Sequence, residues 1–194
     1  GYISSLVRVM DVQETAGAAD MSSKALHSQL FDGVIAISVL PPAAQSRVEE
    51  LFPSTIWLDS NVWRDERCIR RNEYEAGCQG VRAVAKAGFE EVFYLAPWEG
   101  HTHYSANERT RGVRQMARQL KLQLHEYSIP EDTDAYHHFN AIEKRFKPGA
   151  AWIIDGTYTM HTLLLNISSS HWKIGKDLFM LCLDDHFHET AYHW

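Results

Sequence analysis

Short apolar runs rich in β-branched and aromatic residues alternate along the chain with longer segments of helical period. This alternation is typical of parallel β-sheets whose strands are joined by crossover helices. We therefore expect an α/β fold with parallel sheets flanked by helices. The apolar runs predict strands near residues 3–9, 33–37, 55–58, 91–96, 122–127, 151–154 and 179–183.

Two of the predicted helices have recognisable ends. Ser105 is followed three residues later by Glu108, which is the spacing of a capping box and predicts Ser105 as the N-cap. Apolar residues then recur on one face as far as Leu120. A second helix is expected over residues 73–87, ended by Gly88 in the C-cap position.

The loop from Pro97 to Tyr104 contains a proline, a glycine and several rings, and it separates two sets of strand and helix units. We take it as a lobe boundary. The sequence thus predicts two lobes, over residues 1–97 and 98–194.

Composition narrows the class of protein. The 194 residues are 45% hydrophobic, which is enough for a sizeable core. A net charge of -6 without a basic block gives no electrostatic footprint for a polyanion, so we expect no DNA binding by this chain. Three widely spaced cysteines suit reduced thiols and a cytoplasmic protein, and no apolar run is long enough to suggest a membrane.

Charged side chains stand where ligands collect in open parallel sheets, outside the carboxyl ends of the strands. Asp59, Asp155 and Asp184 each follow a predicted strand, and Arg109 lies in the first turn of a helix. A carboxylate accepts two hydroxyl donors and a guanidinium donates to two oxygens, which is the chemistry of sugar recognition. The alternative is that these residues are ordinary helix caps and loop-end charges.

Aromatic residues near these positions offer a face for a sugar ring. Trp98 in the loop is the best candidate, with Tyr104 and Trp63 also available for stacking. The alternative is that they are core or rim residues. Ser105 is more naturally a cap than a ligand contact, although it is kept as a candidate.

A metal-dependent hydrolase is a competing hypothesis. Histidines recur at residues 101–103, 137–138 and 186–188, the last group beside Asp184 and Asp185. However, no HExxH motif, paired CxxC, GxSxG elbow or glycine-rich phosphate loop accompanies them. We therefore expect no enzymatic activity, no metal and no cofactor.

Four segments, in this order and spacing, are similar to the effector-binding domain of transcription regulators of the lactose-repressor/galactose-repressor (LacI/GalR) family. They are residues 31–36 (FDGVIA), 53–59 (PSTIWLD), 105–113 (SANERTRGV) and 179–185 (FMLCLDD). The third is the most specific, because it resembles the family pattern SxxxRxxGf. One departure is that Asp155-Gly156 stands where the family usually has Asn-Asp.

The resemblance implies a two-lobed fold like that of the periplasmic sugar-binding proteins (type I), with each lobe incomplete in this chain. It implies that a sugar-like effector is bound in the cleft between the lobes by Asp59, Arg109 and Asp184, with Asp155, Trp98 and Ser105 as further contacts. It also implies a homodimer that reaches operator DNA only through a headpiece absent from this chain. A stand-alone sugar-binding protein of transport is the alternative.

Overall fold

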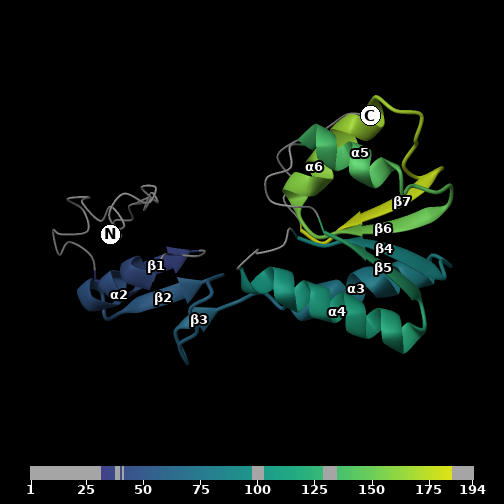
Figure 1. The fold of residues 1–194 in the computed structure, drawn as a ribbon. Helices are drawn as coiled ribbons and strands as arrows, with labels where there is room; N and C mark the ends of the chain where they lie inside the picture. The colour runs from purple at the N-terminus through teal and green to yellow at the C-terminus, as the bar shows by residue number, and fades with distance from the viewer. Residues whose placement is uncertain (1–31, 38–39, 41, 98–102, 129–134, 185–194) are drawn as a thin grey trace, which may run out of the picture. The chain divides into compact units, whose positions relative to one another are not determined.

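The computed structural model describes residues 32–37, 40, 42–97, 103–128 and 135–184, and the chain divides into two compact units, residues 1–71 and 72–194 (Figure 1). Each unit contains its own parallel sheet. Within the described residues, no helix has the length and apolar character needed to cross a membrane.

The smaller unit has a three-stranded parallel sheet in the order β1-β2-β3, with one helix between the first two strands. Its elements are β1 (Val34–Ile37), α2 (Pro42–Leu51), β2 (Thr55–Leu58) and β3 (Cys68–Ile69). Trp57 is the centre of its core and packs with Val48 of α2. The strand β3 was not expected from the sequence, because a pair of residues is too short to show a hydrophobic period.

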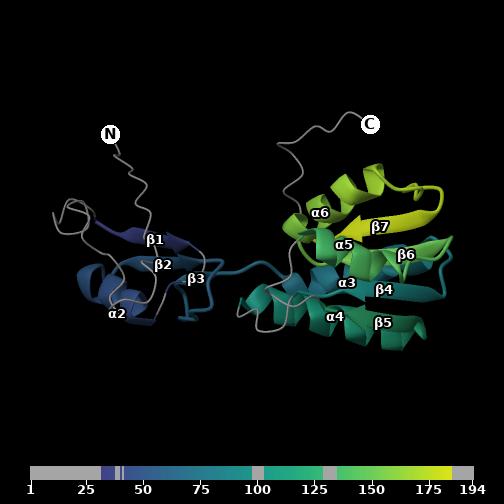
Figure 2. The same cartoon turned by 45° about the horizontal axis from the view of Figure 1, so that its top comes forward.

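The larger unit has a four-stranded parallel sheet in the order β5-β4-β6-β7. Helices α3 and α4 cover one face and α5 and α6 cover the other (Figures 1 and 2). Its strands are β4 (Glu91–Leu95), β5 (Gln123–Tyr127), β6 (Ala150–Ile154) and β7 (Leu178–Cys182). Its helices are α3 (Glu73–Lys86), α4 (Tyr104–Leu120), α5 (Ala135–Glu143) and α6 (Thr157–Ser168).

The two central strands explain why the apolar runs were readable from the sequence. Strands β4 and β6 are buried on both faces, so they are almost continuously apolar. Alternate residues enter the two cores: Tyr94 and Ile153 face α3 and α4, whereas Phe93 and Trp152 face α5 and α6. The parallel sheets and flanking helices confirm the predicted fold class.

The division between the units differs from the expected boundary after residue 97. It falls between Arg71 and Asn72. The reason is strand pairing: β4 lies between β5 and β6 in the larger sheet, and α3 packs against α4. Residues 72–97 therefore belong to the larger unit.

The helix ends are partly as expected. α3 ends at Lys86 with Ala87 as its C-cap, one residue before the predicted Gly88, which follows with a left-handed φ of 89°. The N-cap of α4, however, is His103 and not Ser105, so that prediction was wrong. The His103 ring nitrogen Nδ1 accepts a hydrogen bond from the Ser105 backbone N–H, which is the role expected of a capping side chain. The expected strand over residues 3–9 lies outside the described residues.

Helices α3 and α4 cross with their backbones in contact. A methyl group added at Gly77 would lie 2.3 Å from the Arg109 carbonyl oxygen, and one added at Gly112 would lie 2.1 Å from the Tyr74 carbonyl oxygen. Only glycine fits at either place without separating the helices. This crossing brings the first turn of α3 beside the residues at the start of α4.

We expect Gly77→Ala and Gly112→Ala each to lower the free energy of unfolding by at least about 1–3 kcal/mol, because the added methyl meets a carbonyl oxygen that cannot move alone. The matched control is Gly80→Ala on α3, where the methyl would meet side-chain ends and no backbone, with the end of Leu183 the nearest. Urea denaturation of the three variants tests this. Equal stability of the Gly77 and Gly80 variants would show that the crossing is not under steric constraint.

Candidate functional site

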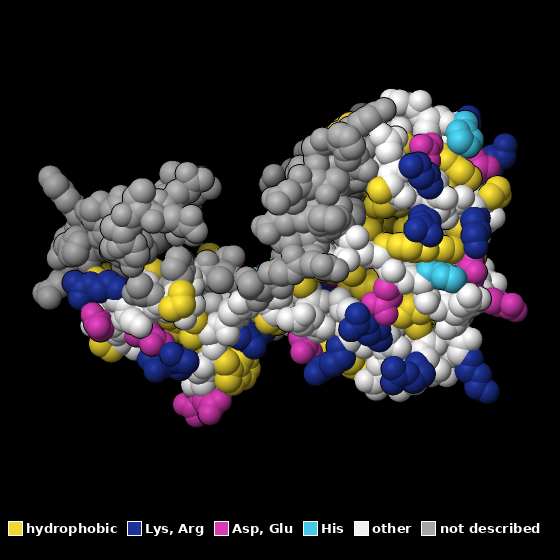
Figure 3. Space-filling view, in the orientation of Figure 1, with side chains coloured by type: hydrophobic (Ala, Val, Ile, Leu, Met, Phe, Trp, Pro, Cys, Tyr) yellow, Lys and Arg dark blue, Asp and Glu magenta, His cyan; other side chains and the backbone are white. Residues whose placement is uncertain are grey.

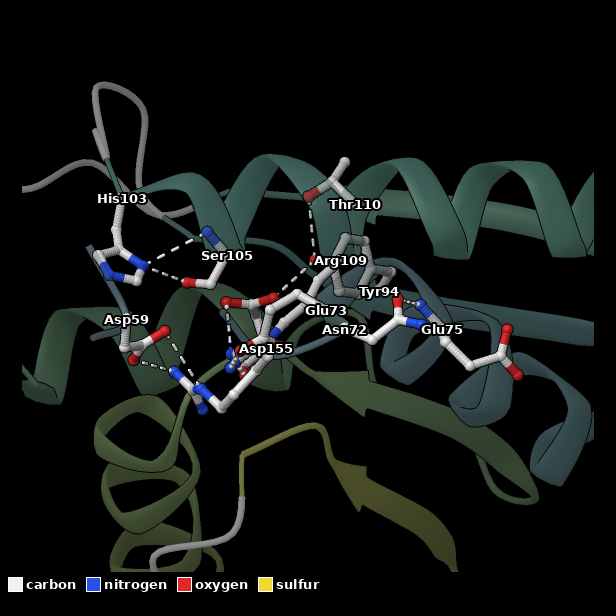
Figure 4. Close-up of polar contacts among 11 residues, drawn as sticks. Asp59, Asn72, Glu73, Glu75, Tyr94, His103, Ser105, Arg109, Thr110 and Asp155 are labelled. Atoms are coloured by element: carbon white, nitrogen blue, oxygen red, sulfur yellow. Dashed lines mark hydrogen bonds and ion pairs between the residues drawn. The ribbon is translucent and has the colours of Figure 1, made fainter. Parts of the chain in front are cut away.

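The Arg109 side chain is the centre of a buried polar network at the carboxyl edge of the larger sheet (Figure 4). Its Nε and Nη2 atoms donate to the two carboxylate oxygens of Glu73 at 2.5 and 3.0 Å. Its Nη1 atom donates to the backbone oxygen of Asp155 at 2.9 Å. The guanidinium thus ties together α3, α4 and the end of β6, and its orientation is fixed by all three.

Asp155 follows β6 directly and is buried beside Arg109. Its Oδ2 atom lies 3.5 Å from Arg109 Nη1, and its Oδ1 atom accepts a hydrogen bond of 2.9 Å from the Tyr94 hydroxyl. The same hydroxyl lies 3.0 Å from Thr110 Oγ1. A chain of hydrogen bonds therefore runs from Asp155 through Tyr94 to α4.

The charged groups of this network shift one another's pKa values. Burial raises the pKa of Asp155 to about 6, and Glu73 and Asp184 add to the rise, whereas the Arg109 charge and the Tyr94 hydrogen bond oppose it. Burial is also the main reason that the pKa of Tyr94 is raised, followed by the charge of Asp155. Burial alone would lower the pKa of Arg109, but Glu73, Asp155 and Asp184 raise it, so Arg109 stays charged.

Asp184 lies just beyond β7 and is partly buried. Its negative charge is felt by Arg109, Asp155 and Cys182, where it raises the pKa of each group. The structure therefore gathers three of the residues predicted from the sequence, Arg109, Asp155 and Asp184, at one edge of the sheet. Such an edge is where ligands bind in open α/β sheets.

Ser105 is buried on the same face of α4 as Arg109, one turn earlier. Its Oγ atom lies 2.7 Å from His103 Nδ1. The His103 ring in turn packs against Tyr104, with ring centroids 4.8 Å apart. The hydroxyl of Ser105 is thus held at the helix start rather than acting as the cap.

Asp59 belongs to the smaller unit, at the carboxyl end of β2. It has a left-handed backbone, with a φ of 52°, and its Oδ2 atom pairs with Arg71 Nη2 at 2.8 Å. In the same unit Trp63 is exposed, and the Arg70 guanidinium lies 5.0 Å from the centre of its ring. Trp98 lies outside the described residues.

The sequence pattern alone did not single out Glu73, Tyr94 or Thr110. Glu73 is an acidic residue in the first turn of a predicted helix, a common place for a solvated charge. Tyr94 lies in an apolar strand and was indistinguishable from a core aromatic residue. Their shared partners, Arg109 and Asp155, are remote in the sequence, and only the fold brings them together.

The part of the chain that the structure describes holds no group of three or more His, Cys, Asp or Glu residues placed to bind a metal ion. Several of the histidines that suggested a hydrolase, including His101 and His186, lie outside the described residues. The three cysteines are free thiols.

No protein-family model matches the chain, and no curated protein matches it. Solved structures do. A probable maltose operon transcriptional repressor from Staphylococcus aureus aligns with a TM-score of 0.67 and 17% identity over 84% of this chain and 60% of its own. A periplasmic binding protein/LacI transcriptional regulator from Alkaliphilus metalliredigens aligns with a TM-score of 0.63 and 12% identity, also over 84% and 60%.

A LacI-family regulator from Burkholderia phymatum gives a TM-score of 0.60 and 14% identity, over 81% of this chain and 61% of that one. At these identities the comparisons show a shared fold. The chain has the fold of LacI-family regulators and periplasmic binding proteins, and it spans about 60% of the length of these solved chains.

The raised pKa of Asp155 predicts a specific pH dependence of stability. The pKa of Asp155 is about 6 in the folded protein, above its ordinary value of 3.8. Its contribution to the free energy of unfolding is therefore complete below pH 3.8 and is lost as the pH rises through 6. The loss amounts to about 3 kcal/mol at roughly 1.4 kcal/mol per pH unit. Asp155→Asn cannot ionise, so its stability relative to the native chain should increase by about this amount between pH 4 and 7.

Urea denaturation of both proteins at a series of pH values measures this difference. Tyr94→Phe supplies a second test. The Tyr94 hydroxyl lowers the pKa of Asp155, so its loss should move the pH range over which stability is lost to higher pH. A stability difference between Asp155→Asn and the native chain that does not vary with pH would contradict the assignment.

Proposed function

We propose that this chain is the effector-binding part of a transcription regulator of the LacI/GalR type, and that its ligand is a sugar or a similar hydroxyl-rich small molecule. The observation that carries the proposal is the Arg109 guanidinium, fixed by Glu73 and by the Asp155 backbone at the carboxyl edge of the larger sheet. The shared fold with LacI-family regulators supports it.

The residues at this edge have the chemistry that a polyhydroxylated ligand needs. Three of the five N–H donors of Arg109 are used by Glu73 and Asp155, which leaves donors for ligand oxygens. The carboxylates of Asp155 and Asp184 would accept hydrogen bonds from ligand hydroxyls. Because Arg109 is already oriented, little conformational entropy is lost when a ligand binds.

Further contacts are proposed from the family positions. Asp59 would be the contribution of the smaller unit, Ser105 would border the site, and Trp98 would offer an aromatic face to the ligand. Among the structures with this fold, the regulator from Alkaliphilus metalliredigens is a complex with D-xylulofuranose, and one from Escherichia coli is a complex with phosphate. The first of these ligands, a sugar, supports the chemical class of effector proposed for this chain.

In this proposal the protein senses its ligand and does not transform it. Ligand binding would stabilise one conformation of the regulator over another, and this shift in population is the signal. A homodimer would pass the change to operator DNA through a DNA-binding headpiece. The shared fold with LacI-family regulators supports this view.

A thermal-shift screen against sugars, sugar phosphates and nucleosides, followed by calorimetry, should identify a ligand. Arg109→Lys should then weaken its binding by roughly 10- to 150-fold, because lysine keeps the charge but loses the fixed pair of donors, worth about 1.5–3 kcal/mol. Lysine is a better test than alanine, which would leave Glu73 buried without its partner.

The matched control is Arg82→Lys, an exposed arginine on α3 that pairs with Glu75. Its ligand affinity should equal that of the native chain, and circular dichroism should show that both variants are folded. Equal affinities of the Arg109 and Arg82 variants would remove Arg109 from the site. The upstream reading frame separates a regulator, preceded by a helix-turn-helix, from a transport protein, preceded by a secretion signal.

A further inference from the structure

The outer face of α4 has a hollow that the proposed effector site does not use. It has a volume of about 250 Å³. Its lining consists only of polar side chains, Asn107, Thr110, Arg111, Arg114, Gln115 and Arg118. Figure 3 shows that lysine and arginine side chains gather on the part of the surface formed by this helix.

The charges of this hollow, which we call the α4 groove, favour an anion. Arg111 is paired with Glu108 at 2.6 Å and Arg114 with Glu126 at 2.8 Å. Arg118 is exposed and, within the described residues, has no carboxylate within ion-pair distance. The groove therefore has one uncompensated positive charge and two further guanidinium groups beside it.

Guanidinium groups bind phosphate oxygens in pairs, and neutral amide and hydroxyl donors from Asn107, Gln115 and Thr110 complete such a site. The volume is below the range typical of drug-sized ligands. It suits a phosphate group with a small carbon skeleton better than a larger molecule.

Thr110 connects the α4 groove to the effector site. The Tyr94 hydroxyl donates its one hydrogen to Asp155, so the hydroxyl of Thr110 is the donor in the 3.0 Å contact between Thr110 and Tyr94. A chain of hydrogen bonds is cooperative, because each donor strengthens the next. An anion that accepts a hydrogen bond from the Thr110 hydroxyl would remove this strengthening of the hydrogen bond between Tyr94 and Asp155.

We propose that the α4 groove binds the phosphate group of a small metabolite, and that binding there weakens effector binding at Asp155 through Thr110 and Tyr94. The coupling is reciprocal, so a bound effector would weaken phosphate binding by the same factor. Phosphate binding by the groove does not depend on the proposed function, whereas the effect on the effector rests on it.

The phosphate site is tested by calorimetry on the full chain at constant ionic strength, with inorganic phosphate and a sugar phosphate as separate probes. Arg118→Gln should weaken the binding of the phosphate group at least fivefold, whereas the control Arg82→Gln, outside the groove, should leave it unchanged. Tighter binding of the sugar phosphate than of inorganic phosphate identifies a metabolite as the source. Absence of binding, or binding that Arg118→Gln does not weaken, overturns the site.

The coupling has its own readout, which works with or without an identified effector. Carbon-13 NMR of the Asp155 carboxyl group should show its titration midpoint at higher pH with phosphate than with chloride. In Thr110→Val the two midpoints should coincide. Where an effector is known, its affinity should fall several-fold in phosphate for the native chain only. A midpoint that phosphate does not move overturns the coupling and leaves the effector proposal unaffected.

Discussion

The larger unit depends on one buried ion pair. Arg109 and Glu73 have side chains only 4% and 3% exposed, and each would be unstable in the core without the other. Removing two charges from water costs several kcal/mol per ion, which their attraction offsets only when the geometry is close to ideal. A pair of this kind is therefore poor evidence for stability, and its value lies in fixing where a guanidinium points.

The crossing of α3 and α4 provides that geometry. Gly77 and Gly112 let the two backbones touch, and Gly112 is on the same face of α4 as Arg109, one turn later. This gives the segment SANERTRGV a physical explanation. The arginine needs Glu73 as its partner, and the glycine lets the helix that supplies Glu73 come close enough.

The sequence predicted what depends on local pattern. The central strands β4 and β6 are apolar because they are buried on both faces, and Gly88 ends α3 because its φ is positive. The lobe boundary and the helix cap were wrong in detail, because strand order and the competition between His103 and Ser105 are set by the fold. The placement of Arg109, Asp155 and Asp184 at the sheet edge was predictable from the strand and helix ends. The contacts of Glu73 and Tyr94 were not, because they join residues that are distant in sequence.

The two units differ in how fully the faces of their sheets are covered. In the smaller unit the Trp57 face of the sheet is packed, whereas Ile35, Ile37 and Ile69 on the other face are exposed among the described residues. In the larger unit both faces are covered, and the hydrogen-bond partners of the Arg109 guanidinium, Glu73 and Asp155, belong to this unit. The orientation of the guanidinium is therefore fixed by residues of its own unit. It follows that the larger unit would supply the rigid donor group of the proposed site.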